Sequence, residues 1–243
     1  MFKVKYILPL IFLPTSLIAQ EMHGYWSLGF VAMQSSEEYI NHDSESSVLP
    51  YVRYETDVIS IGMPDGITWK AYNNKDLGLN IFAKPRFHGL SDSDNIERAT
   101  TGDVGVSLKY DIIRGTSIKA SVQKEMTGEH GGFEANASIS QFIPPFLGLP
   151  IVASTGIKWM DANLSNYLYG VGSDEAMNGL SQYDTGVSFV PYASLSSFYS
   201  LSSNVSLFST VSYKLLPDNI TASPLVKNDN DAYNVILGIG YNF

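Results

Sequence analysis

The chain of 243 residues contains no cysteine, little charge and no long hydrophobic run. The absence of cysteine excludes disulfides, thiolate metal sites, cysteine nucleophiles and a lipid-anchored N-terminal cysteine. Charged residues make up only 16% of the chain, against about 25% in a typical soluble protein, so the composition disfavours a soluble cytosolic enzyme. The net charge of −9 argues against nucleic acid as a partner, because phosphates require a basic surface.

The N-terminus predicts export. Lys3 and Lys5 form a basic region, residues 6–13 form a short apolar core, and Ala19 offers a small residue for cleavage. The sequence therefore predicts a signal peptide over residues 1–19 and a mature domain over residues 20–243. The apolar core is too short for a membrane anchor, since spanning a bilayer as a helix takes about 20 apolar residues.

The C-terminal segment alternates between apolar side chains and polar or small ones. Such alternation places one face in lipid and the other in the lumen of a transmembrane barrel, with aromatic residues at the two interfaces. A terminal aromatic strand also resembles the signal that the barrel assembly machinery of the outer membrane reads. We expect that machinery, the lipid bilayer and lipopolysaccharide as partners. The predicted assembly signal consists of Tyr233, Val235, Leu237, Ile239, Tyr241 and Phe243.

The same period of two recurs along the mature chain and predicts an all-β fold, a transmembrane antiparallel β-barrel of about twelve strands. Ten strands are the alternative, if the two between Val48 and Gly62 are lost, because bacterial barrels have an even number. A soluble β-sandwich shows similar alternation but would carry more charge. The expected strands cover residues 24–33, 48–55, 57–62, 66–73, 77–88, 102–113, 116–126, 132–142, 151–160, 184–196, 204–214 and 233–243.

The connections between these strands alternate in length. We expect the short ones, residues 73–76, 114–115, 144–150 and 197–203, in the periplasm, and the long ones, residues 34–47, 89–101, 161–183 and 215–231, outside the cell. The long connections are acidic, which indicates either capture of cations and cationic ligands or a solvated surface. Their acidic residues are Glu37, Glu38, Asp43, Glu45, Asp92, Asp94, Glu97, Asp161, Asp174, Glu175, Asp218, Asp229 and Asp231.

Charged residues within the strands must point inward, since Lys or Arg facing the membrane midplane costs about 2–4 kcal/mol. Two interpretations remain open for them, a pore lining or internal ion pairs. The residues concerned are Lys84, Arg86, Glu125, Glu134 and Lys158.

Catalysis has weak support. His88, Asp92 and His130 could form a hydrolase site only if their connections folded over one another, and no Gly-x-Ser-x-Gly motif is present. We therefore expect no enzymatic activity, no cofactor and no metal site, and a barrel hydrolase is the last of the alternatives.

An ordered set of short segments runs through nearly the whole mature chain. These are Trp26–Gly29, Leu49–Pro50, Tyr54–Glu55, His130–Gly132, Trp159-x-Asp161, Tyr167–Val171, Glu175–Ala176, Gly179–Leu180, Tyr183–Asp184, Ser223–Val226 and Gly238–Phe243. With them the chain resembles the MipA/OmpV (MltA-interacting protein) family of outer-membrane proteins. The resemblance implies the outer membrane of a Gram-negative-type bacterium and no catalytic residues. The founding member of the family is described as a scaffold that joins a lytic murein transglycosylase to a murein synthase, and other relatives as adhesins or ligand-binding proteins.

Scaffolding of murein-processing enzymes is therefore the leading functional hypothesis, with Phe146 and Leu147 as candidate contacts in a periplasmic turn. A surface adhesin or cationic-ligand-binding protein with acidic loops is one alternative, and a narrow pore is another. In the third long connection we expect a folded lid that includes a short helix over residues 173–180, with Ser173 as its N-cap. The lid residues are Trp159, Asp161, Tyr167, Tyr169 and Tyr183.

Overall fold

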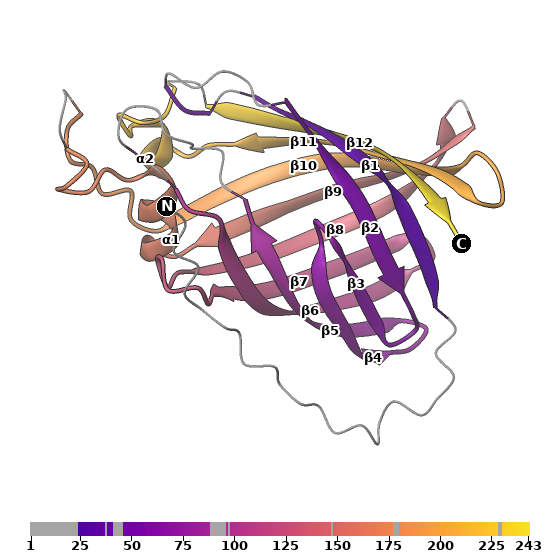
Figure 1. The fold of residues 1–243 in the computed structure, drawn as a ribbon. Helices are drawn as coiled ribbons and strands as arrows, with labels where there is room; N and C mark the ends of the chain where they lie inside the picture. The colour runs from indigo at the N-terminus through magenta and orange to yellow at the C-terminus, as the bar shows by residue number, and fades with distance from the viewer. Residues whose placement is uncertain are drawn as a thin grey trace.

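A computed structural model describes residues 24–36, 38–40, 46–87, 96, 98–146, 148–176, 180–227 and 230–243. Twelve strands form a closed antiparallel barrel, in which each strand pairs with its sequence neighbours and β1 closes against β12 (Figure 1). The twelve-strand prediction is confirmed, and the ten-strand alternative is wrong. The predicted signal peptide, residues 1–19, lies outside the described residues. None of the helices among the described residues is long and apolar enough to cross a membrane.

The strands begin and end within a few residues of the expected positions. They are β1 (Tyr25–Ser35), β2 (Ser46–Glu55), β3 (Ile59–Met63), β4 (Gly66–Asn73), β5 (Leu77–Arg86), β6 (Thr101–Ile113), β7 (Thr116–Glu125), β8 (Phe133–Phe146), β9 (Leu149–Met160), β10 (Ser188–Ser200), β11 (Val205–Leu215) and β12 (Asp231–Asn242). Two short helices, α1 (Ala162–Tyr169) and α2 (Asp218–Thr221), lie in the connections after β9 and β11.

Strand β12 shows why this sequence forms a barrel wall. Leu237, Ile239 and Tyr241 are exposed on its outer face, where lipid can cover them. Gly238 faces the lumen, and the ring of Phe208 from β11 occupies the space where a side chain at this position would stand. The period of two in the sequence thus separates a lipid face from a lumen face.

The two ends of the barrel differ in the length of their connections. One end, called the turn end, carries the C-terminus and the connections of residues 56–58, 74–76, 114–115, 147–148 and 201–204 (Figure 1). The opposite end, called the loop end, carries α1, α2 and the long connections. The expected asymmetry holds except between β3 and β4, where Pro64 and Asp65 form a short turn at the loop end.

Strands β8 and β9 extend further toward the turn end than expected. Pro144 and Pro145 lie within β8 instead of in a turn. They can do so because Gln141 already pairs with Thr116, the first residue of β7, and a bulge separates Ile143 from Phe146 in the pairing with β9. Proline lacks an N–H group and is tolerated where a strand has no neighbour that needs one.

Candidate functional site

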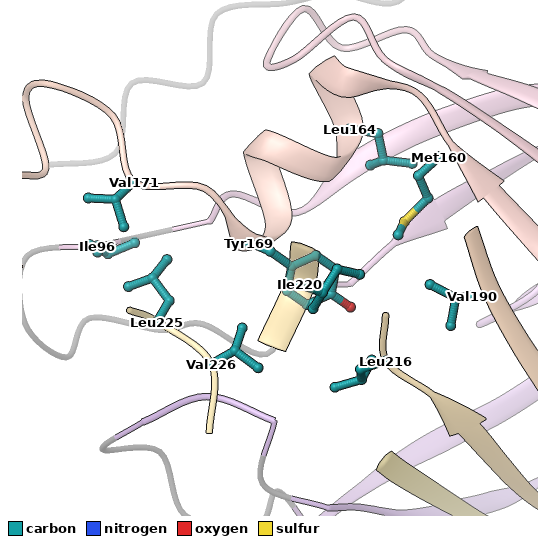
Figure 2. Packing of buried hydrophobic residues seen from close by; sticks show 10 residues of the cluster. All are labelled: Ile96, Met160, Leu164, Tyr169, Val171, Val190, Leu216, Ile220, Leu225 and Val226. Carbon is teal, nitrogen blue, oxygen red and sulfur yellow. The ribbon is translucent and has the colours of Figure 1, made fainter. Parts of the chain in front are cut away.

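The long connections meet across the loop end and form an apolar cap. Met160 and Val190 belong to the lumen-facing sides of β9 and β10, so the cap closes over the lumen rather than beside it. Tyr39, from the connection between β1 and β2, packs against the cap. Figure 2 shows its ten buried side chains, contributed by four parts of the chain. These are Ile96, Met160, Leu164, Tyr169, Val171, Val190, Leu216, Ile220, Leu225 and Val226.

Helix α1 is the largest element of the cap. Asp161 is its N-cap, and the carboxylate oxygen Oδ1 accepts a hydrogen bond of 2.9 Å from the backbone N–H of Leu164. The buried Leu164 side chain points toward the barrel rim (Figure 2). Gly132, in the connection between β7 and β8, lies so close to the helix that an added Cβ would be 2.5 Å from the Leu164 nitrogen. Asp161 therefore stabilises the start of the helix, and the connection at Gly132 packs against its first turn.

The helical turn or two expected over residues 173–180 lies partly outside the described residues, which leave out 177–179, and the described part forms a single turn. Residues 173–175 form a turn, closed by a hydrogen bond of 2.9 Å from the Ala176 N–H to the Gly172 carbonyl. The helix of this connection, α1, has its N-cap at Asp161, twelve residues before the expected N-cap at Ser173. In this position Leu164 is buried in the cap, and Glu175 remains available to pair with Arg98 from another long connection.

Two of the predicted lid tyrosines join the long connections to each other. Tyr169 is buried, its ring lies 5.9 Å from that of Tyr39, and its hydroxyl donates to Glu38 at 3.4 Å. Burial and the neighbouring Glu38 carboxylate raise the pKa of Tyr169 well above its ordinary value. Tyr183 exchanges two backbone hydrogen bonds with Val171, and its hydroxyl donates to the Asn219 carbonyl at 3.0 Å.

The third predicted lid tyrosine packs on a histidine. The ring of Tyr167 stacks on that of His130 at 4.6 Å, and its hydroxyl donates to the Ala99 carbonyl at 3.2 Å. His130 accepts a hydrogen bond of 3.0 Å from the Gly132 N–H at Nδ1, and burial lowers its pKa. Trp159, by contrast, occupies an outward position of β9, between the inward Lys158 and Met160. The structure thus brings Asp161, Tyr167, Tyr169 and Tyr183 together at the loop end, and leaves Trp159 on the barrel wall.

An ion pair that the sequence did not suggest joins the connection between β5 and β6 to the connection between β9 and β10. Arg98 is buried, and its Nη2 atom lies 3.2 Å from both the Glu175 carboxylate and the Gly170 carbonyl. Burial alone would raise the pKa of Glu175, but the hydrogen bonds from Arg98 and from the Gly172 N–H outweigh burial and lower it. No motif marks Arg98 in the sequence, so only the folded chain reveals it.

Beneath the cap, charged side chains cross the lumen. Arg86 donates to Asp103 and to Glu134, both at 2.8 Å, and Gln123 donates to the same two carboxylates at 2.9 and 3.2 Å. Lys158 lies 3.7 Å from Glu134. These five residues come from five consecutive strands, β5 to β9. Internal ion pairing is thus the interpretation that holds for Arg86, Glu134 and Lys158.

Glu125, the other inward acid, has a different role. Its carboxylate accepts hydrogen bonds from the backbone N–H groups of Gly128 at 2.7 Å, His130 at 3.2 Å and Gly131 at 2.7 Å. It therefore holds the connection between β7 and β8 in the shape that meets α1.

Among the described residues, the charged side chains of the lumen are buried beneath the cap and exposed toward the turn end. The side chains of Arg86 and Asp103 are 15% and 1% exposed, whereas those of the ion-paired Lys109 and Asp111, on inner positions toward the turn end, are 52% and 40% exposed. A cavity of about 680 Å³ lies in the lumen.

Several candidate residues fall outside the described part of the chain. Leu147 is one of them, and for Phe146 only the backbone is described, where it pairs with Leu149 at the end of β8. The candidate hydrolase residues His88 and Asp92 also lie outside it. So do some of the acidic residues expected in the long connections, namely Glu37, Asp43, Glu45, Asp94, Glu97 and Asp229.

The amino-acid sequence matches one family of known proteins along most of its length. A profile of the family described as "MltA-interacting protein MipA" matches residues 28–243. The Escherichia coli K12 protein named "Putative outer membrane protein YiaT" is 26% identical over 226 residues, which cover 89% of this chain and 90% of that protein. The "MltA-interacting protein" of the same strain is 25% identical over 252 residues and is covered, like this chain, to 100%. These relatives and the closed barrel locate the chain in the outer membrane.

Among solved structures, the KdgM porin covers 89% of this chain and is itself covered to 99%, with 7% identity and a TM-score of 0.45. A likeness at this level carries no argument about function.

Proposed function

The chain belongs to the MltA-interacting protein MipA family, and from this membership and the open turn end we propose that it is a non-enzymatic scaffold of the outer membrane. In this proposal it holds murein-processing enzymes at the periplasmic side. The name of its E. coli relative gives an interaction as that protein's role. The family resemblance described above gives the partners as a lytic transglycosylase and a murein synthase.

An exposed apolar surface at the turn end is the observation that carries this proposal. Phe142 of β8 and Phe198 of β10 are 43% and 57% exposed. By strand alternation Phe142 shares the inner face with Ser138 and Ser140, so it faces the barrel axis and not the lipid. Phe198 has the same position relative to Ser196. Exposed apolar patches on a surface that lipid cannot cover mark contacts with other proteins.

The location of this surface fits enzymes that work on murein. Figure 1 shows the turns between β8 and β9 and between β10 and β11 at the same end of the barrel as the C-terminus. In outer-membrane barrels the short turns face the periplasm, which is where murein lies.

The alternatives have less support from the geometry. A pore is opposed by the apolar cap and by the ion pairs beneath it. Adhesion through acidic loops is weakened because three of the six described acids are engaged within the protein: Glu38 pairs with Lys214 at 2.6 Å, Glu175 pairs with Arg98, and Asp161 caps α1.

The test is site-specific photo-crosslinking in living cells from position 142 or 198, followed by mass spectrometry of the adducts. We expect a lytic transglycosylase or a murein synthase from both positions. Phe189 is the matched control, because it is an equally exposed phenylalanine, at 54%, on the outer face of β10 near the loop end. Adducts with assembly chaperones only, or the same adducts from Phe189, would refute the scaffold.

A further inference from the structure

The cavity in the lumen is not used by the scaffold proposed above. Strand pairing places a row of polar side chains around its wall, one from each of five neighbouring strands. This row consists of Asn80, Ser107, Ser121, Asn136 and Lys158, and all five line the cavity. Hydroxyl and amide groups in this number offer both donors and acceptors to a ligand.

Three lysines on the cavity wall are incompletely neutralised. Lys84 and Lys119 form no ion pair within the part of the chain that the structure describes. Lys158 shares the Glu134 carboxylate with Arg86, which holds it more closely, at 2.8 Å against 3.7 Å. Lumen cations thus exceed the acids that are free to pair with them.

The remaining charges of the cavity wall cancel. Lys214 pairs with Glu38 at 2.6 Å. Asp65 belongs to a balanced group of two acids and two bases, in which Arg53 lies 2.6 Å from Glu55 and 3.6 Å from Asp65, and Lys70 also pairs with Glu55. The cavity is therefore positive in a protein whose net charge is −9. Low-dielectric walls focus such a field and concentrate anions within it.

An aromatic ring lies flat on the same wall. A Cβ added to Gly156 of β9 would be 2.8 Å from the Cζ atom of Tyr192 in β10, so the ring occupies the space that a side chain there would fill. The Tyr192 hydroxyl donates to Asn136 at 3.1 Å and fixes the ring across β9. A ring held in this way offers an apolar face to the C–H face of a sugar.

The cavity reaches toward the loop end on one side of the barrel. Asp65, in the short turn between β3 and β4, lines it and has a side chain that is 57% exposed. Toward the turn end, Lys109 and Asp111 occupy inner positions with side chains that are 52% and 40% exposed. Water and small solutes can therefore reach the lumen beside the cap.

From these observations we propose that the lumen cavity binds a carboxylated saccharide. Lys84 and Lys158, on either side of Glu134, face its carboxylate, Lys119 adds positive charge further along the wall, and Tyr192 lies under a sugar ring. This site is distinct from the apolar surface of the scaffold, and neither proposal depends on the other.

The first test uses isothermal titration calorimetry on the full-length protein in detergent micelles. N-acetylmuramic acid and N-acetylglucosamine are the two probes, since they differ by one lactyl carboxylate. We expect the acidic sugar to bind at least about tenfold more tightly, which corresponds to about 1.4 kcal/mol, and added salt to reduce the difference. Equal affinity for the two sugars, or no binding of either at millimolar concentration, would overturn the proposal.

The second test removes the cations. The double variant Lys84→Gln and Lys158→Gln should lose the preference for the acidic sugar, and Lys119→Gln should weaken it. Lys124→Gln is the matched control, because Lys124 points outward over the ring of Phe133, at 5.0 Å, and its replacement removes the same charge. Heat-modifiable migration on gels checks folding, and Lys119→Gln decides the matter if the double variant does not fold. An equal loss of preference in Lys124→Gln would contradict the site.

Discussion

The two ends of this barrel are built from the same twelve strands but use their charges in opposite ways. At the loop end, Asp103 and Glu134 are buried and share one guanidinium, and apolar side chains from four parts of the chain cover them. At the turn end, Lys109 and Asp111 pair in the open. The difference shows that the cap removes the charges beneath it from water, whereas the charges toward the turn end stay in contact with water.

The largest effect expected from breaking this contrast concerns Arg86. In Arg86→Met, Asp103 and Glu134 stay buried without their main partner, which should cost about 3–5 kcal/mol of stability. Lys109→Met is the control at the open end, where loss of an exposed pair costs about 0–1 kcal/mol. Urea unfolding in lipid vesicles measures both, and equal losses would show that the two ends do not differ.

Next in size is the apolar cap. Leu164→Ala leaves a cavity among the buried side chains of the cap and should destabilise the cap by about 2–5 kcal/mol. Leu195→Ala is the same change on the lipid face, where Leu195 is 53% exposed. Limited proteolysis of the folded barrel should cleave near α1 much faster in the first variant only. Matching cleavage rates would mean that the cap is not held by its core.

A smaller effect is expected at the start of α1. Asp161→Ala removes the acceptor for the Leu164 N–H and should cost about 1 kcal/mol. Asp161→Asn keeps an acceptor and should cost less. Hydrogen exchange over residues 162–169, followed by mass spectrometry, measures the loss of protection. If both variants exchange like the unaltered protein, Asp161 does not stabilise this helix.

The smallest expected effect is a change in the protease sensitivity of the cap at low pH. Because the pKa of Glu175 is lowered in the folded protein, its pairing with Arg98 contributes fully above the unfolded-state pKa and is lost as pH falls through the folded-state pKa. Protease sensitivity of the cap should therefore rise below about pH 4.5. In Glu175→Gln the cap should be looser at neutral pH and less dependent on acid. A variant with the same pH profile as the unaltered protein would assign the acid response to another group.

The barrel wall could be predicted from the sequence because strand alternation is local. In each strand, neighbouring residues face opposite sides of the wall, as Leu237 on the lipid face and Gly238 on the lumen face do in β12. The prediction of a turn at Pro144 and Pro145 is wrong, because proline ends a strand only where a neighbouring strand needs its N–H group, and β7 already ends there.

The cap and the ion pairs could not be predicted in the same way. Arg98 and Glu175 are 77 residues apart, and only tertiary packing brings them together. Helix α1 had a readable signal in Asp161 followed by Leu164 and Leu168, but the acidic residues after Ser173 offered a competing start. Packing of Leu164 against the barrel rim decides between them.

The part of the lumen beneath the cap and the cavity below it can be compared directly on one strand, since the chain contains no cysteine. Ser188 and Ser194 lie on the same face of β10, Ser188 buried beside Ser165 of α1 at 2.6 Å and Ser194 lining the cavity. The measurement is the rate at which a small maleimide labels Ser188→Cys and Ser194→Cys in the purified folded protein. Labelling at position 194 should be at least about tenfold faster, because position 188 reacts only when the cap opens locally. Equal rates, or faster labelling at position 188, would contradict a cap that covers the loop-end part of the lumen while the cavity below it stays accessible.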